Sequence, residues 1–193
     1  MMTMMQILIF LLKTLGSIYL TIVLLRFILQ LIRADYYNPI TKFIVKATNP
    51  LLVPLRKIIP GVGGIDWACL VLAFLIKIVL LQLILLIAGI GYIGITKLVA
   101  TAFLGILSLL ATTYFWAMII IVIASWVAPY SHNPGLSLLR QIIEPSLAPI
   151  RKIVPAPGGL DFSPMIALLL LHIFNIYIMP ALAATLGVPM GLL

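Results

Sequence analysis

The sequence has very little charge, and acidic residues are the scarcest part of it. Its 193 residues include 4 Asp and Glu against 12 Lys and Arg, and charged residues make up 8% of the chain. Hydrophobic residues make up 64%, and the mean hydropathy is +1.31. A soluble domain of this length could not bury so much apolar surface, so the surrounding solvent must be lipid. The composition predicts an all-α integral membrane protein.

Residues that act in disulfides, metal binding and nucleophilic catalysis are also scarce. Cys69 is the one cysteine, and there are two histidines, so neither a disulfide nor a Cys/His metal cluster is expected. No serine or cysteine stands in a nucleophile, base and acid pattern. We therefore expect no enzyme, with no catalytic residue, cofactor or metal. The net charge of +8 lies mostly beside apolar runs, where anionic lipid headgroups are the nearer counter-charge, so no nucleic-acid partner is expected.

Four apolar segments are long enough to cross a bilayer. They are residues about 15–33, 67–88, 106–127 and 162–186. Gly89, Gly91 and Gly94 supply the turn between the second and third segments. The N-terminal run lacks the basic region and the cleavage site of a signal peptide, so we expect the first segment to remain as a membrane anchor.

The chain repeats itself at an offset of 95 residues. "PLRKIIPGVGGID" at Pro54 to Asp66 returns as "PIRKIVPAPGGLD" at Pro149 to Asp161. This predicts two units, residues 1–98 and 99–193, each made of a span, a basic connector and a second span. Because each unit crosses the membrane twice, both have the same orientation, which is a parallel repeat of helical hairpins.

Basic residues are concentrated in the two connectors. Only Lys13 and Lys97 lie on the other side of the predicted spans. By the positive-inside rule the connectors face the cytoplasm, and both termini are periplasmic. The connector residues are Arg33, Lys42, Lys46, Arg56, Lys57, Arg140, Arg151 and Lys152.

The first connector begins with a helix signal. Asn38 precedes Pro39, a side-chain N-cap followed by proline at the first helical position. Apolar residues then recur with helical spacing, and Lys42 and Lys46 stack on another face. We expect a short amphipathic helix in the headgroup layer, with its apolar side toward the membrane. The apolar positions are Ile40, Phe43, Ile44 and Ala47.

The prolines that follow predict an end to this helix. Pro50, Pro54 and Pro60 each remove a backbone donor, so we expect irregular backbone at the interface after the amphipathic helix. The basic pairs of this stretch have two open interpretations. They either orient the protein in the membrane or contact a lipid headgroup or partner specifically. The pairs are Arg56 with Lys57 and Arg151 with Lys152; Lys42 and Lys46 are further contact candidates.

Each connector ends in a glycine pair and an aspartate. Gly63 and Gly64 suit a tight turn with positive φ, and Asp66 stands where the N-cap of the next span belongs. Gly158, Gly159 and Asp161 are the equivalents. "GVGGID" matches neither nucleotide fingerprint, and an aspartate at the helix start would repel a phosphate. We therefore interpret these residues as a structural turn and cap.

The polar candidates within the predicted spans are Arg26, Lys77, His172 and Asn175. Lys77 and His172 are equivalent in the repeat and lie near the predicted midplane. They either form a polar interior for a proton, ion or lipid headgroup, or are a snorkelling lysine and a hydrogen-bonded histidine. No acidic residue lies within a predicted span, which disfavours a cation channel or a proton-coupled transporter.

The motif stretches resemble a known family. "LLRFILQLIRADYYNPITKFIVKATNPLLVPLRKIIP" from Leu24 to Pro60 and "EPSLAPIRKIVPAPGGLDFSPMI" from Glu144 to Ile166 are similar to the YggT (YlmG) family, in its two-repeat proteobacterial form. The resemblance implies a protein of the bacterial inner membrane. It also implies links to osmotic-stress tolerance, cation homeostasis, cell-division gene neighbourhoods and plastid cytochrome maturation or nucleoid organisation, without an established reaction.

Two functions remain open from the sequence. The first is a non-enzymatic inner-membrane protein that serves envelope or osmotic-stress functions, or organises the membrane, through its basic cytoplasmic segments. Its expected partners are membrane lipids with anionic headgroups, together with another membrane protein or a second copy of the chain. The second is an ion or small-solute conduit for cation or osmotic homeostasis, lined by Arg26, Lys77 and His172.

Overall fold

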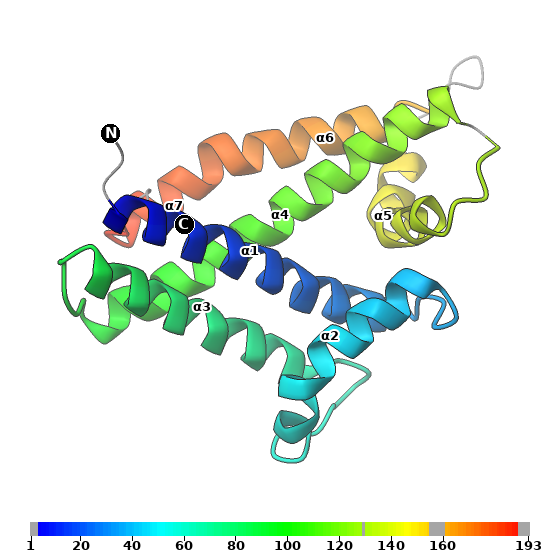
Figure 1. Cartoon of the computed structure of the whole chain (residues 1–193). Helices are drawn as coiled ribbons and strands as arrows, with labels where there is room; N and C mark the ends of the chain where they lie inside the picture. The colour runs from blue at the N-terminus through cyan, green and yellow to red at the C-terminus, as the bar shows by residue number, and fades with distance from the viewer. Residues whose placement is uncertain (1–3, 129, 155–160, 189–193) are drawn as a thin grey trace.

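The computed structural model describes residues 4–128, 130–154 and 161–188, and their regular elements are all helices (Figure 1). These confirm the predicted all-α fold of four membrane-spanning helices in two tandem hairpins. Gly158 and Gly159 lie outside the described residues. The elements are α1 (Met4–Leu31), α2 (Pro39–Arg56), α3 (Trp67–Ile87), α4 (Ile95–Val127), α5 (Pro134–Ile153), α6 (Ser163–Ile173), η2 (Phe174–Ile178) and α7 (Met179–Thr185).

Four helices are long and apolar enough to cross a membrane: α1, α3, α4 and the continuous run α6–η2–α7. The second and fourth agree closely with the predicted spans, whereas α1 and α4 begin at Met4 and Ile95, well before about 15 and 106. A window of about 20 residues is enough to cross the hydrocarbon, so it finds a minimal span and misses apolar helix that continues beyond it. Lys97 consequently lies in the first turn of α4.

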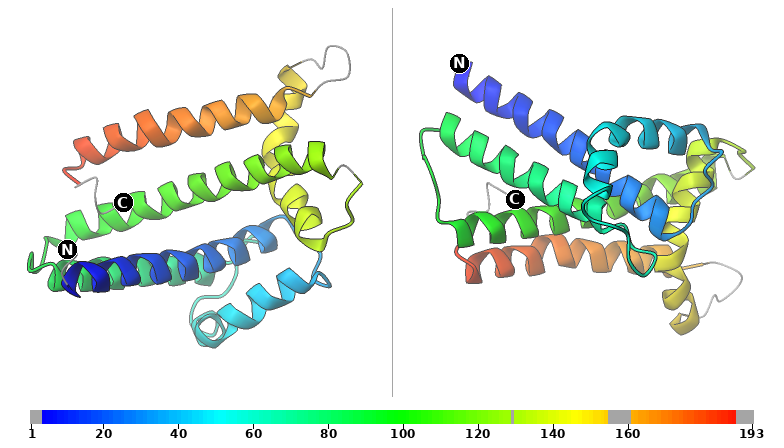
Figure 2. Two further views of the ribbon diagram at one scale, coloured as in Figure 1. Left: turned by 45° about the horizontal axis from the view of Figure 1, so that its top comes forward. Right: turned by 90° about the horizontal axis from the view of Figure 1, so that it is seen from below.

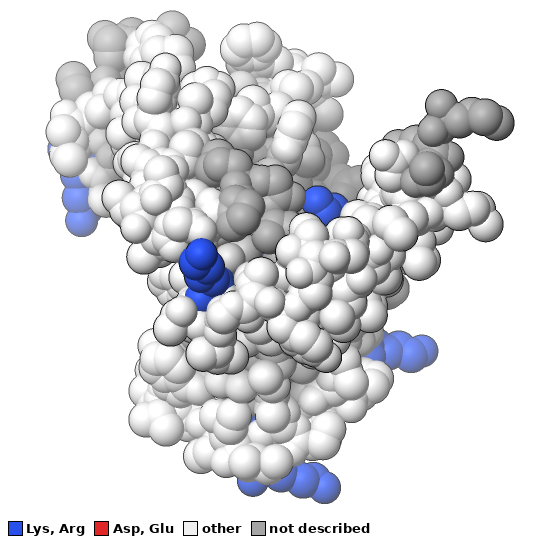
Figure 3. All heavy atoms as spheres, turned by 90° about the vertical axis from the view of Figure 1, so that its left-hand side faces the viewer, with Lys and Arg blue, Asp and Glu red and all other residues white. Residues whose placement is uncertain are grey.

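The spans are joined at one end by the connector helices. α4 contacts α6 of its own hairpin and also α1 and α3 of the first, so it joins the two hairpins. α2 and α5 run across the ends of the spans rather than parallel to them, and both lie at the same end of the molecule (Figure 2). The turn between α3 and α4 lies at the opposite end. Figure 3, which views the molecule from that side, shows a mainly uncharged face with isolated basic side chains.

Close helix packing in the first hairpin depends on a glycine. Gly16 of α1 is buried, and a Cβ at this position would lie 2.5 Å from Leu80 Cδ1 of α3. Small residues allow membrane helices to approach closely and gain van der Waals contact, which replaces the hydrophobic effect inside lipid. α1 and α3 therefore form a tight pair.

The prediction of irregular backbone after the amphipathic helix is wrong at Pro50 and Pro54, and it is confirmed at Pro60, which follows the end of α2 at Arg56. α2 continues through Pro50 and Pro54, and α5 continues through Pro145 and Pro149. All four prolines are exposed, so the carbonyls that they leave without a helical donor can reach water or headgroups instead of being buried. Both helices bend (Figure 2), as proline-containing helices do.

The face that α2 packs on the protein also differs from the predicted apolar face. Thr41, Ile44, Thr48 and Leu52 are the buried residues, whereas Phe43 remains 62% exposed. The Thr48 hydroxyl donates to the Ile44 carbonyl at 2.8 Å, which satisfies a polar group inside the contact. Two adjacent faces of α2 thus have different roles. One packs against the bundle, and the Phe43 face stays exposed.

The last span is interrupted by a π-helical turn, η2. Pro180 follows it, at the start of α7. A proline cannot donate to the carbonyl four residues before it and clashes with that carbonyl, and a locally wider helix relieves both problems. Within this turn the Asn175 Oδ1 atom is buried and has no hydrogen-bond partner among the described residues.

Candidate functional site

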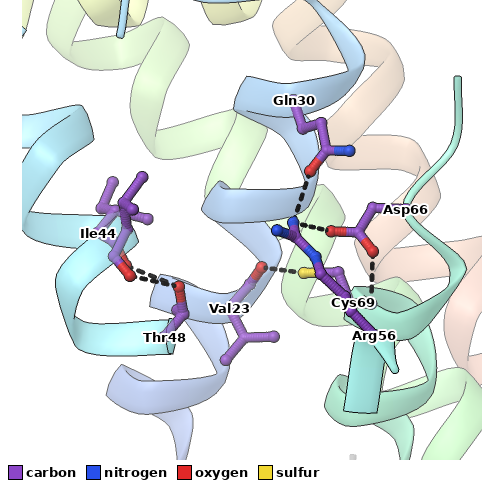
Figure 4. A network of polar contacts seen from close by, with 8 residues as sticks. Val23, Gln30, Ile44, Thr48, Arg56, Asp66 and Cys69 are labelled. Atoms are coloured by element: carbon purple, nitrogen blue, oxygen red, sulfur yellow. Dashed lines mark hydrogen bonds and ion pairs between the residues drawn. The ribbon is translucent and has the colours of Figure 1, made fainter. Parts of the chain in front are cut away.

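An ion pair joins the end of the first connector to the start of the next span. Arg56 Nη2 pairs with Asp66 Oδ2 and also donates to Gln30 Oε1 at 2.9 Å (Figure 4). Asp66 is 3% exposed, and its other carboxylate oxygen accepts from the Cys69 amide at 3.3 Å as the N-cap of α3. Arg56 thereby connects α2 to both α1 and α3.

The second connector has an equivalent but more open ion pair. Arg151 Nε donates to Asp161 Oδ2 at 2.8 Å, and Arg151 also pairs with Glu144. Both Arg151 and Asp161 are 40% exposed, in contrast to the buried Asp66. The hydrogen bond that Arg151 donates to Asp161, partly opposed by desolvation, raises the pKa of Arg151. Desolvation acts to raise the pKa of Asp161, but hydrogen bonds from Ser163 and Arg151 outweigh it, so that pKa lies below its usual value.

Asp161 is not the N-cap that the sequence predicts. α6 begins at Ser163, and Phe162 occupies the cap position, so Asp161 stands one residue further out. Its Oδ1 still accepts the Ser163 amide at 2.9 Å. Pro164 at the second helical position has no amide to be capped, which removes one of the donors that an N-cap normally serves.

The role of the arginines was missed at the level of sequence. The repeat contained the signal: an arginine and an aspartate of opposite charge recur with the same ten-residue separation in both units. The sequence alone predicts Arg56 and Arg151 as lipid or partner contacts, and the aspartates only as caps. The structure instead uses each arginine internally.

The connector lysines point outward. Lys42, Lys46, Lys57 and Lys152 are all exposed, and none forms an ion pair within the part of the chain that the structure describes. Lys42 Nζ lies 5.6 Å from the centre of the Tyr37 ring, which is within cation–π range. In each Arg-Lys pair, therefore, the arginine holds the fold together while the lysine faces the surroundings.

The first connector ends in a tight turn before α3. Gly63 and Gly64 have φ of 65° and 80°, values that L side chains rarely adopt. Val62 and Ile65 pair across them through two backbone hydrogen bonds. This turn reverses the chain, so that Asp66 comes back toward Arg56.

The structure does not bring Lys77 and His172 into one site. Lys77 is half-buried and packs on Gly105 of α4, where a Cβ would lie 2.3 Å from Lys77 Cε. It lines a cavity of about 70 Å³ together with Lys13. His172 is exposed and stacks on Phe115, with ring centres 6.3 Å apart. Lys77 and His172 are thus equivalent positions in the repeat, but their surroundings differ.

Arg26 lies beside a cavity at the connector end of α1. It is half-buried, and its Nη1 atom is buried without a hydrogen-bond partner among the described residues. The cavity measures about 230 Å³ and lies between the last turns of α1 and the first half of α2. Within the described residues, no group of three or more His, Cys, Asp or Glu side chains is arranged to hold a metal.

Comparison with known proteins gives consistent matches along the chain. The family described as CCB3/YggT matches residues 5–88 and 100–182, one segment in each hairpin. An uncharacterised protein of Pseudomonas aeruginosa is 53% identical over 185 residues, covering 95% of this chain and 94% of that protein. The uncharacterised protein YggT of Escherichia coli K12 is 38% identical over 180 residues, covering 91% of each. No solved structure matches.

Proposed function

Because the chain belongs to the CCB3/YggT family, we propose that it is a non-enzymatic protein of the bacterial inner membrane that gathers anionic lipids, or a membrane-protein partner, at its connectors. The connectors face the cytoplasm, both termini are periplasmic, and the activity supports envelope or osmotic-stress functions. The observation that carries this proposal is the difference within the Arg-Lys pairs. The arginines are used in internal ion pairs, which leaves Lys57 and Lys152 free to act outward.

The arrangement suits the surface of an anionic membrane. Lys42 and Lys46 lie on the same helix as the exposed Phe43, so cationic and apolar side chains are presented together. An aromatic ring inserts at the headgroup boundary, while lysines at the surface of an anionic leaflet contribute about 1 kcal/mol each. The bent α2 and α5 keep this surface at the ends of the spans.

Changing the four outward lysines to glutamine is expected to reduce enrichment of anionic lipid around the protein. Lys42, Lys46, Lys57 and Lys152 are exposed, so the variant is expected to fold normally and lose only the attraction to the surface. In nanodiscs of mixed phosphatidylglycerol and phosphatidylcholine, we expect the enrichment of phosphatidylglycerol to fall several-fold. Mass spectrometry of the lipids retained by the purified protein measures this enrichment.

The matched control for that variant is Lys97→Gln, which removes a cation from the opposite end of the molecule. It is expected to leave lipid enrichment unchanged. In cells, the four-lysine variant is expected to lose complementation of an osmotic-stress phenotype while inserting normally. Full complementation together with unchanged lipid enrichment would refute the proposed function.

The proposed orientation can be tested with single cysteines. Cys69 is 0% exposed, so the native thiol provides little background labelling. Lys57→Cys and Tyr92→Cys place thiols at exposed positions on the two opposite ends. A membrane-impermeant maleimide added to intact spheroplasts is expected to label the Tyr92→Cys variant. The Lys57→Cys variant is expected to be labelled only after lysis. The reverse order would contradict a cytoplasmic connector surface.

The alternative of an ion or small-solute conduit remains a prediction from the sequence. It depends on Lys77 and His172 sharing a path, and the two side chains have separate surroundings. We therefore place the function at the connectors.

A further inference from the structure

We propose that the cavity beside Arg26 is a binding site for a phosphate group, either of an anionic lipid headgroup or of a free phosphate. This site is separate from the outward lysines and goes beyond the proposed function. It is lined by Arg26, Leu29, Gln30, Arg33, Ala34, Tyr36, Thr41 and Val45. The lining contains two guanidinium groups and no carboxylate, so its charge is uncompensated.

Two unpartnered donors point to an absent acceptor. The Arg26 Nη1 and Thr41 Oγ1 atoms are buried and have no hydrogen-bond partner among the described residues, and both residues line the same cavity. Thr41 is 5% exposed. Buried polar groups are almost always satisfied, and an unsatisfied charged group is the most costly kind. A ligand oxygen between the two side chains would satisfy both.

The nearby internal acid is already in use. Asp66 is bonded to Arg56 and to the Cys69 amide, and Arg56 in turn holds Gln30, which lines the cavity (Figure 4). Arg26 therefore has no ion-pair partner within the described chain. The Arg56 pair fixes one wall of the cavity without neutralising its charge.

The donor set fits phosphate. Guanidinium groups match phosphate oxygens through paired hydrogen bonds, and Thr and Tyr hydroxyls can donate further ones. Thr41 stands in the first turn of the 18-residue α2, where the positive end of the helix dipole also favours an anion. Arg33 reaches the site from the left-handed position that ends α1, with φ of 52°, a place where glycine is usual.

The lining and location also suit a lipid. Leu29, Ala34 and Val45 provide apolar wall beside the cationic groups. Arg26 lies five residues before the end of α1, roughly 7.5 Å along the axis at ~1.5 Å per residue. This depth is near the boundary between headgroups and hydrocarbon, where the glycerol end of a lipid would meet apolar side chains.

The second repeat supplies a natural comparison. A cavity of about 400 Å³ in the second repeat shares three lining positions with the Arg26 cavity, where Ile121, Ser125 and Arg140 stand in place of Arg26, Gln30 and Val45. Its two arginines, Arg140 and Arg151, are accompanied by two acids, Glu144 and Asp161. Charge in that cavity is balanced internally. The phosphate site is therefore confined to the first repeat.

The test is ligand-dependent stabilisation of the purified full chain in a neutral detergent. Addition of phosphatidylglycerol is expected to raise the melting temperature saturably, since a ligand that binds only the folded state stabilises it. Arg26→Gln is expected to raise the half-saturating concentration about tenfold or more, and Thr41→Val a few-fold. Arg140→Gln, which removes an arginine from the second cavity, and the four-lysine variant are expected to keep the wild-type value.

A parallel titration with inorganic phosphate distinguishes the two sources. Saturable stabilisation by phosphatidylglycerol alone identifies a lipid site, and stabilisation by inorganic phosphate alone identifies a free-phosphate site. Without ligand, Arg26→Gln is expected to be at least as stable as the wild type, because the Arg26 guanidinium makes no hydrogen bond or ion pair with the described residues. If Arg26→Gln does not fold, Thr41→Val carries the test. No saturable stabilisation by either ligand, or the same half-saturation in Arg26→Gln or Thr41→Val as in wild type, overturns the proposal.

Discussion

Asp66→Ala is expected to lower the free energy of unfolding by about 2–4 kcal/mol. The change removes an N-cap, worth about 1 kcal/mol, and leaves Arg56 without its counter-ion. Loss of one partner from a fully buried pair costs about 3–5 kcal/mol, and the 34% exposure of Arg56 reduces that cost here. Unfolding of the detergent-solubilised protein by a denaturing surfactant measures the difference.

The repeat provides the matched control for this change. Asp161→Ala removes the equivalent carboxylate, but Asp161 is 40% exposed and Arg151 keeps Glu144 as a partner. The loss is expected to be under about 1 kcal/mol, as for an exposed ion pair. Asp66→Asn, which keeps a capping oxygen and removes the charge, is expected to lie between the two. Equal losses for Asp66→Ala and Asp161→Ala would show that burial does not distinguish the two ion pairs.

The sequence predicts the fold well because the deciding signals are local or periodic. Four apolar runs and one offset of 95 are sufficient for two hairpins, and Asn38 before Pro39 correctly predicts the capped start of α2, with its side chain accepting from the Ile40 amide at 2.9 Å. These features depend on length, breakers and caps. None of these features depends on which helix packs against which.

The errors concern properties that depend on neighbours. Whether Pro50 ends a helix depends on whether its carbonyl partner is solvated, and the sequence does not reveal that Pro50 faces outward. The docking face of α2 contains Thr41 and Thr48, which hydropathy alone does not assign to an interior. Thr41 is a candidate for contacting the phosphate only because the fold brings it to the same cavity as Arg26.

The duplicated motif serves unequal purposes in the two halves. Both halves use an arginine and an aspartate ten residues apart to close the connector onto the next span. In the first half Asp66 is buried and Arg56 holds Gln30, which lines the cationic cavity, whereas in the second half the pair is open and Arg151 also pairs with Glu144. The architecture was thus retained in both copies while the uncompensated charge is found in one. We infer that the first hairpin carries the more specific chemistry.

The same asymmetry predicts unequal effects of shortening the residue that docks each connector. Leu52 of α2 is 0% exposed and packs among α1 and α3 residues, including Val23 and Leu72. Its equivalent Leu147 is also buried, but it borders the 400 Å³ cavity, and Ala167 stands at the position of Leu72. A side chain beside an existing cavity has fewer contacts to lose than one that is enclosed on all sides.

Leu52→Ala is therefore expected to cost about 2–5 kcal/mol of unfolding free energy, the range for a leucine removed from a closed core. Leu147→Ala is expected to cost less, at or below the lower end of that range. Unfolding of both variants under the same conditions as Asp66→Ala gives the comparison. A larger loss for Leu147→Ala would contradict the looser packing of the second connector. If Leu52→Ala also weakens stabilisation by phosphatidylglycerol, docking of α2 positions Thr41 opposite Arg26, because Leu52 itself does not line that cavity.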